Sequence, residues 1–173
     1  HTTEHPESTT ATEETIQMVT EQNERLSKLV RTLLDMSELQ TVSRNDRIEL
    51  HSLIEEVLTD LEPLAQEKKV ELIQKSQGAG AKADEELFLT GSDILINRML
   101  YNLVENAIKY NRENGSVTVS AIRKKNEVVL TVSDTGNGID EAFREQIFEP
   151  FFRVDKSRSR ELGGVGLGLA MVR

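Results

Sequence analysis

Alternation of two hydrophobic periods is the feature of this sequence that most limits its fold. Short segments with strand-like patterns of apolar residues are followed by longer segments with apolar residues every three or four positions, as in helices. The predicted strands are residues 47–50, 70–73, 87–89, 117–121 and 128–132, and the predicted helices are residues 52–66 and 97–111. Strands and helices that alternate in this way pack as layers. The predicted fold class is therefore α/β: a two-layer sandwich in which helices cover one face of a mixed sheet.

Local signals refine the ends of these elements. Pro63 predicts a late kink or an early end in its helix, because proline has no N–H to donate. Ser92 or Asp93 can cap the start of the next helix, and Gly115 suits a left-handed turn after that helix ends. Residues 141–148 are predicted to form one short helix.

A separate long helix is predicted over residues 14–39. Its apolar residues form one continuous stripe: Ile16, Val19, Leu26, Leu29, Val30, Leu33 and Met36. A helix with one apolar side is not stable alone, so we expect a partner helix from the same chain or from a second subunit. Residues 40–46 break the pattern and mark a boundary between residues 1–44 and a domain at residues 45–173.

The helix at 97–111 carries an unusual polar side. Its apolar side is formed by Ile96, Met99, Leu100, Leu103, Val104 and Ala107. Asn102, Asn106 and Lys109 fall together near the opposite side, at positions i, i+4 and i+7. Asparagine is a poor helix former, so the pair suggests a ligand that needs carboxamides, such as a hard cation beside phosphates. Lys109 could meet a phosphate as a point charge. The alternative is a half-buried helix whose asparagines bond to their neighbours.

Asp134-Thr-Gly136-Asn-Gly138 directly follows the last predicted strand. The carboxylate of Asp134 is a natural acceptor for an exocyclic amine such as that of adenine, and the glycines let backbone approach a planar ligand. The alternatives are an ordinary Asx turn and one half of an aspartic protease site. The protease reading needs two such carboxylates, and the sequence has one copy of the motif.

The last 21 residues add a basic segment and a glycine-rich turn. Residues 153–160 carry Arg153, Lys156, Arg158 and Arg160 against a single acid, Asp155. Next, residues 163–168 place four glycines before an apolar helix start, an arrangement that can expose backbone N–H groups to an anion. The two segments predict a mobile cover over phosphates. The alternatives are a solvated loop and a flexible hinge.

Composition excludes several other functions. The chain of 173 residues has no cysteine, so it has no disulfide, no thiol nucleophile and no cysteine-ligated zinc. Its net charge of −9 argues against nucleic-acid binding. No apolar run approaches the roughly 20 residues of a membrane span, so we expect any membrane anchor of the parent protein to lie outside this chain. The location expected for the chain itself is cytoplasmic.

Four of these motifs, in this order, resemble the ATP-binding catalytic domain of sensor histidine kinases, within the GHKL ATPase superfamily. The segment from Asn102 to Tyr110 resembles the N box, and Asp134–Gly138 resembles the G1 box. Phe148-Glu-Pro-Phe151 is similar to the F box, and residues 163–170 are similar to the G2 box. The resemblance implies a Bergerat-type ATP-binding fold for residues 45–173. The helix at 14–39 resembles the second helix of the dimerisation domain.

The resemblance also implies a role for each matching residue. Asn106, with Asn102, would hold Mg²⁺, and Lys109 and Arg153 would join Asn106 as the catalytic residues that position the phosphates. Asp134 would accept the adenine amino group. The remaining residues expected to line the ATP site are Tyr110, Gly136, Gly138, Ile139, Arg158, Gly164, Gly166, Leu167 and Gly168.

The implied activity is ATP-dependent histidine autophosphorylation in a two-component system, with ATP and Mg²⁺ as cofactors. Neither His1-Thr-Thr-Glu nor His5-Pro-Glu-Ser matches the family's phosphoacceptor segment. We therefore expect the acceptor histidine to lie outside this chain, and we also expect the domain to be incomplete after Arg173. The implied partners are a response regulator and a second copy, bound through the N-terminal helix. The alternatives are a serine-directed kinase or another ATPase of the same superfamily, and a non-catalytic dimeric module.

Overall fold

The computed structural model describes residues 15–20, 22–23, 26–27, 30, 42–75, 87–154 and 168–172. Its strands are β1 (Asp46–Glu49), β2 (Glu71–Lys75), β3 (Phe88–Gly91), β4 (Ser116–Lys124) and β5 (Glu127–Asp134). Its two main helices are α2 (Leu50–Lys68) and α3 (Asp93–Lys109), and three short 3₁₀ helices are η1 (Glu141–Phe143), η2 (Gln146–Phe148) and η3 (Leu169–Met171). Each predicted strand is present within a few residues of its expected bounds.

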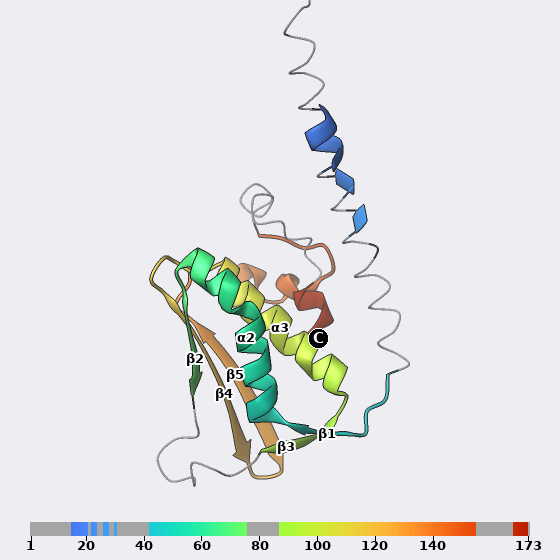
Figure 1. Ribbon diagram of the computed structural model, residues 1–173, viewed down its shortest axis with the longest axis vertical. Coiled ribbons are helices and arrows are strands. Elements are labelled where there is room, and N and C mark those ends of the chain that lie inside the picture. Colours follow the sequence, from blue (N-terminus) through green and yellow to red (C-terminus); the bar gives the residue numbers. More distant parts are fainter. Residues whose placement is uncertain are drawn as a thin grey trace, which may run out of the picture.

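The described strands form two sheets. In the larger sheet β4 lies between β2 and β5, parallel to β2 and antiparallel to β5, with Val119 opposite Val132. The smaller sheet pairs β1 with β3 in antiparallel fashion. Helices α2 and α3 pack against each other on one side of the larger sheet (Figure 1). The prediction of a mixed sheet covered by helices on one face is confirmed.

The core lies between these two layers and follows the sequence periods. Alternate residues of β4 are buried at Val117, Val119 and Ala121, because successive strand side chains point to opposite faces. Helix α2 contributes Leu50, Leu53, Ile54, Val57, Leu58, Leu61 and Ala65, and α3 contributes Leu100, Val104, Ala107 and Ile108. Full burial of each large side chain contributes about 1.5–3 kcal/mol. This packing fixes the rotation of α3 about its axis and therefore the direction of its polar side.

Helix α2 begins with a side-chain cap from the end of β1. The Glu49 carboxylate accepts hydrogen bonds from the backbone N–H groups of His51 (3.2 Å), Ser52 (2.7 Å) and Leu87 (3.3 Å). The first two satisfy N–H groups that have no partner within the helix, and the third reaches the residue before β3. One carboxylate thus ties β1, α2 and the start of β3 together.

The structure corrects three local predictions. Of the two outcomes predicted for Pro63, the early end is wrong, because helix α2 runs through Pro63 to Lys68. Pro63 and Thr59 are both exposed, so water can satisfy the carbonyl that proline leaves unpaired. Residues 141–148 form η1 and η2 in place of one helix. Neither segment buries a residue, so no packing face supports a longer helix. The left-handed turn after α3 falls on Asn114, with φ of 58°, and not on Gly115.

The N-terminal segment is helical at each of its described positions between residues 15 and 30. The side chains of Ile16, Val19, Leu26 and Val30 are all more than half exposed. Leu29, Leu33 and Met36 of the predicted stripe lie outside the described residues. Within the described part of the chain, the helices are too short or too polar to cross a membrane.

Candidate functional site

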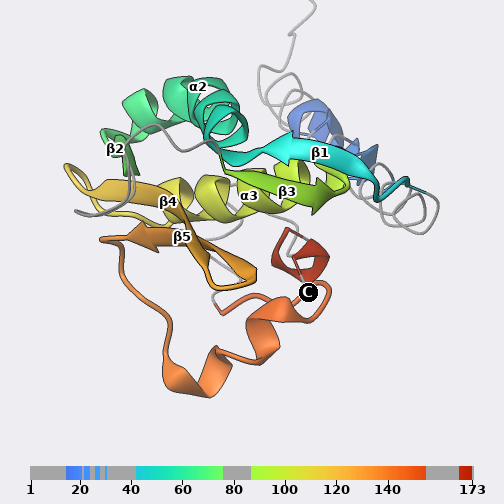
Figure 2. The same ribbon diagram turned by 90° about the horizontal axis from the view of Figure 1, so that it is seen from below.

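Asn102 and Asn106 lie side by side on α3, where the start of η3 approaches them. A Cβ atom at Gly168 would lie 3.2 Å from Asn102 Oδ1 and 3.7 Å from Asn106 Nδ2. Helix η3 also packs against η2 (Figure 2). Among the described residues, the hydrogen bonds do not involve either carboxamide. Two neutral carboxamide oxygens one turn apart are suitable ligands for a hard cation such as Mg²⁺. Because Gly168 has no side chain, the space beside the two carboxamides stays open.

Lys109, one turn further along α3, is held by an ion pair. Its Nζ lies 2.7 Å from Glu105 Oε1, and the two side chains are only 14% and 26% exposed. The pair bridges successive turns of the helix. Helical spacing places Lys109 on the Asn102 side of α3, and an incoming phosphate would share the charge of Lys109 with Glu105.

Asp134 begins a tight turn that packs against the end of the same helix. Asp134 Oδ1 accepts a hydrogen bond of 2.8 Å from the N–H of Gly136, which makes an Asx turn. A Cβ at Gly136 would lie 2.7 Å from Tyr110 O and 3.3 Å from Asn111 Cα, so only glycine fits against this backbone. The Asp134 turn and the Asn106 side chain thus flank the C-terminal end of α3.

Apolar surface lies beside this turn. Tyr110 is 45% exposed at the end of α3, and Ile139 is 47% exposed after the turn. Gly138 has a φ of 69°, a conformation that favours glycine, and open space where a side chain would begin. The exposed ring and the open backbone can accept a flat ligand next to the Asp134 carboxylate.

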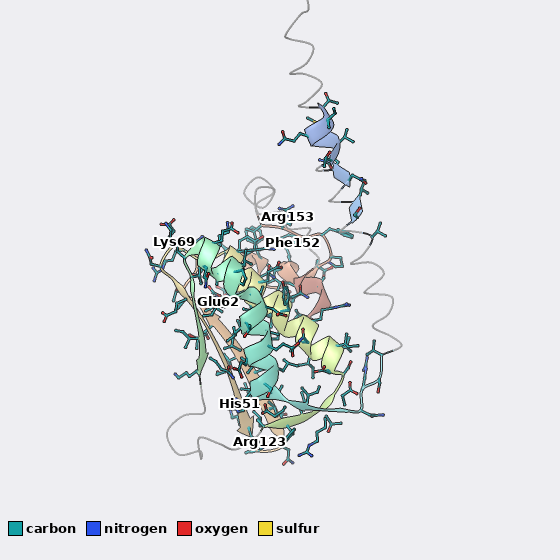
Figure 3. The ribbon with its side chains drawn as sticks, viewed as in Figure 1. His51, Glu62, Lys69, Arg123, Phe152 and Arg153 are labelled. Atoms are coloured by element: carbon teal, nitrogen blue, oxygen red, sulfur yellow. The ribbon has the colours of Figure 1, made fainter. Side chains whose placement is uncertain are left out.

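Arg153 carries a buried polar atom without a partner. Its Nη2 atom is buried and makes no hydrogen bond among the described residues. The neighbouring Phe152 packs on Phe143, with ring centroids 6.0 Å apart, and this contact anchors the segment. Leaving a charged donor unpaired costs about 1–3 kcal/mol or more, so the site favours an anion. Figure 3 shows Arg153 and His51 at opposite ends of the α/β domain, which excludes His51 from this site.

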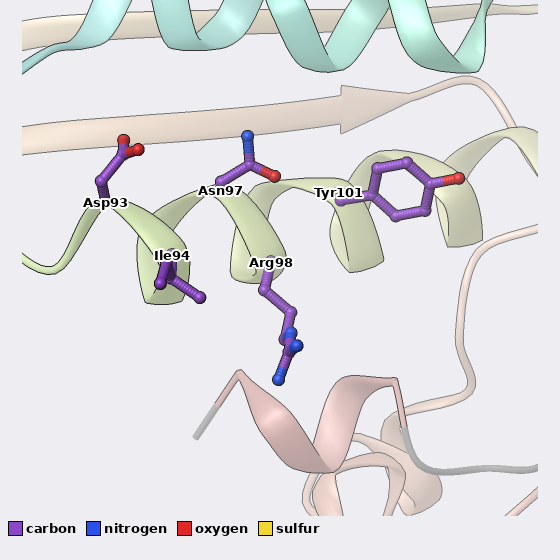
Figure 4. Close-up of a pocket in the computed structure, with 5 residues that line it drawn as sticks. All are labelled: Asp93, Ile94, Asn97, Arg98 and Tyr101. Carbon is purple, nitrogen blue, oxygen red and sulfur yellow. The ribbon is translucent and has the colours of Figure 1, made fainter. Parts of the chain in front are cut away.

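A hollow of about 420 Å³ lies on the N-terminal half of α3 (Figure 4). It is lined by Asp93, Ile94, Asn97, Arg98 and Tyr101. Burial raises the pKa of the Tyr101 phenol, and the Glu105 and Asp60 carboxylates raise it further. Arg98 lies one turn before Asn102, so the hollow borders the Asn102 side of the helix at its Arg98 edge, while Asn97 lies toward the other side. The sequence offered no sign of it beyond that helical spacing.

The remaining predicted site residues cannot be placed. Arg158, Gly164, Gly166 and Leu167 lie outside the described residues. Two residues that no sequence motif singled out, Asn111 and Thr135, share a hydrogen bond of 3.1 Å that joins the end of α3 to the Asp134 turn.

Comparison with known families matches residues 91–173 to the histidine kinase-, DNA gyrase B- and HSP90-like ATPases. This range contains α3, the Asp134 turn, Arg153 and Gly168. It therefore includes every site residue discussed above.

Curated relatives and solved structures extend the likeness. The sensor-like histidine kinase SenX3 of Mycolicibacterium smegmatis is 33% identical over 156 residues, which cover 88% of this chain and 38% of SenX3. The nucleotide-free catalytic domain of histidine kinase ThkA superposes with a TM-score of 0.63 at 27% identity, over 76% of this chain and 78% of that one. A structure of ThkA in complex with the response regulator protein TrrA superposes with a TM-score of 0.64 at 26% identity, over 87% of this chain and 42% of that one.

Proposed function

Because residues 91–173 match the family of histidine kinase-, DNA gyrase B- and HSP90-like ATPases, we propose that this chain is the ATP-binding catalytic part of a sensor histidine kinase. Its ATP would lie across the C-terminal end of α3. The adenine amino group would face Asp134, and the phosphates would run past Asn106 toward Gly168 and Arg153. Residues 1–44 would belong to the dimerisation region and residues 45–173 to the catalytic domain.

The observation that carries this proposal is the meeting of two surfaces on one helix. Gly168 approaches Asn102 and Asn106 from one segment, and Gly136 contacts Tyr110 from another. A nucleotide has chemistry for both surfaces, since its base needs a hydrogen-bond acceptor and its phosphates need cations and donors. The unpaired Nη2 of Arg153 supplies one such donor.

The residues of the chain would act mainly by binding and orientation. A Mg²⁺ ion held at this site would supply positive charge to offset part of the phosphate charge. Asn102 and Asn106 would hold the ion, while Arg153 and Lys109 would orient the γ-phosphoryl group toward a histidine nitrogen outside this chain. At that histidine, a bond from phosphorus to nitrogen would form as the bond from phosphorus to the β-phosphate oxygen breaks, and ADP would leave. Positioning of this kind provides most of the catalysis in phosphoryl transfer.

We also propose two protein partners. The ThkA complex supports a response regulator as the protein that receives the phosphoryl group. The exposed apolar side chains of the N-terminal helix support a second copy of the parent protein as its packing partner.

Calorimetric titration with the non-hydrolysable analogue AMP-PNP and Mg²⁺ tests the site. Asn106→Ala should abolish Mg²⁺-dependent binding, because the variant loses a metal ligand and keeps the helix. Asn97→Ala is the matched control, since Asn97 lies on the side of α3 opposite Asn106. This variant should bind AMP-PNP as the unmodified chain does. Equal affinity in all three proteins would exclude the metal role. In the complete protein, an acid-labile product after incubation with labelled ATP would indicate phosphohistidine, and an acid-stable one would favour a serine-directed kinase.

A further inference from the structure

A compact hydrogen-bond network joins the end of α3 to the Asp134 turn. The hydroxyl of Thr135 donates to Asn111 Oδ1 at 3.1 Å. Asn111 follows the C-terminal cap of α3, and Thr135 is the residue next to Asp134. The bond therefore connects the helix that carries Asn106 with the turn that carries the Asp134 carboxylate, across 24 residues of sequence.

Ser116, at the start of β4, is the third member of the network. Its N–H donates to Thr135 Oγ1 at 2.9 Å, and its carbonyl accepts from Thr135 N at 3.2 Å and from Asn111 Nδ2 at 3.1 Å. Asn111 Oδ1 also accepts from the N–H of Arg112 at 3.0 Å. Both ends of the Asn111 carboxamide and the Thr135 hydroxyl are thus in use, a condition under which a network holds one geometry.

Glycine is required where the backbone passes this network. A Cβ at Gly115 would lie 2.7 Å from Thr135 Oγ1 and would also collide with Asn111 Oδ1. A Cβ at Gly136 would lie 2.7 Å from Tyr110 O. Close contact on both sides leaves the turn little freedom to slide along the helix.

We propose that Asn111 and Thr135 are positioning residues that hold the Asp134 turn in register with α3, so that one nucleotide can reach both surfaces at once. This inference rests on the proposed function. Neither residue needs to touch the nucleotide. A displacement of about 1 Å in such a site can cost up to roughly 100-fold in activity, so a single bond between the two halves has a measurable effect.

Ligands that reach one half or both halves provide the test. AMP-PNP with Mg²⁺ spans the site. Adenosine reaches the Asp134 turn and the neighbouring Tyr110 but not the two asparagines, and tripolyphosphate with Mg²⁺ reaches the asparagine side of α3 but not the turn. Thr135→Val removes the hydroxyl at nearly constant shape. It should weaken AMP-PNP binding about tenfold, the effect of one lost hydrogen bond, and leave the two partial ligands unchanged. Thr135→Ser restores the hydroxyl and should restore AMP-PNP affinity.

Thr135→Val also deprives the Ser116 N–H of its hydrogen-bond acceptor and could therefore disturb the fold. Asn111→Ala is a second variant that avoids this problem. Asn111→Ala removes the hydrogen bond between Thr135 and the end of α3 and keeps the hydrogen bonds between Thr135 and the backbone of Ser116. It should show the same pattern of affinities. The double variant should lose no more AMP-PNP affinity than the weaker-binding single variant, because both changes remove the same hydrogen bond.

Three outcomes would overturn the inference. Unchanged AMP-PNP affinity in both variants would show that the bond does not align the halves. Equal loss for all three ligands would indicate a general structural role, and loss for adenosine as well as AMP-PNP would indicate direct contact with the base. If the unmodified chain binds no AMP-PNP, the proposed function itself fails. That result differs from unchanged AMP-PNP affinity in Thr135→Val, which overturns only the inference.

Discussion

At the scale of single residues, Gly136 and Gly91 show that the kind of neighbouring atom decides whether glycine can be replaced by alanine. A Cβ at Gly136 would press on a backbone oxygen, Tyr110 O, at 2.7 Å. A Cβ at Gly91 would meet the terminal methyl of Ile96 at 3.2 Å. A methyl group at the end of a flexible side chain can move aside, whereas the peptide at the end of α3 cannot.

Gly136→Ala should therefore separate the Asp134 turn from α3. We expect a loss of AMP-PNP affinity of about tenfold or more and a loss of about 1–3 kcal/mol in the free energy of unfolding, as for other overpacked sites. Titration calorimetry and denaturant unfolding measure the two effects. Gly91→Ala is the control, because Gly91 ends β3, away from the turn, and it should bind AMP-PNP normally. Normal binding by Gly136→Ala would contradict the close packing of turn and helix.

At the scale of elements, the Glu49 cap decides how β1, α2 and β3 are joined. Burial alone would raise the pKa of the Glu49 carboxyl group, but hydrogen bonds from Ser52, His51 and Leu87 outweigh burial and hold the pKa below its ordinary value. A carboxyl group whose pKa is lower in the folded protein stabilises the fold above its unfolded pKa, about 4.3 for glutamate. This stabilisation is lost as the pH falls through the folded pKa.

Glu49→Gln should therefore remove part of the pH dependence of stability. The parent chain should lose unfolding free energy as the pH falls from 7 to 3, and the variant should start about 0.5–2 kcal/mol lower at pH 7, the usual value of a cap, and fall less steeply. Denaturant unfolding at several pH values measures this. Glu56→Gln, an exposed position on the same helix, is the matched control and should follow the parent curve. Parallel curves for parent and Glu49→Gln would refute the cap.

Elements were predictable where one hydrophobic period continued for several residues. The strand β4 and the buried side of α3 are examples, because periods of two and of about 3.6 residues are read directly from the sequence. The Glu49 cap was not predicted, since one of its three donors comes from Leu87, far away in the sequence. The division of residues 141–148 into η1 and η2 depends on the lack of a packing face, which only the tertiary structure shows.

At the scale of the whole molecule, the sequence predicted which residues could form a site better than it predicted how they are held together. Asn102 and Asn106 share one side of α3 because helical spacing requires it. The contact of Gly168 with that side, and of Gly136 with Tyr110, depends on how separate segments pack. The Asn111–Thr135 bond was overlooked for the same reason. Asparagine and threonine are common in turns, so neither residue is unusual until the fold brings both together.

The central claim is that one Mg²⁺-nucleotide contacts both α3 and the Asp134 turn. NMR titration of the isotope-labelled chain with AMP-PNP and Mg²⁺ tests this claim most directly. We expect the NMR signals of the Asn102 and Asn106 side-chain amides and of the Gly136 backbone N–H to shift together, with a single dissociation constant. Shifts confined to α3 or to the turn, or two different dissociation constants, would contradict it.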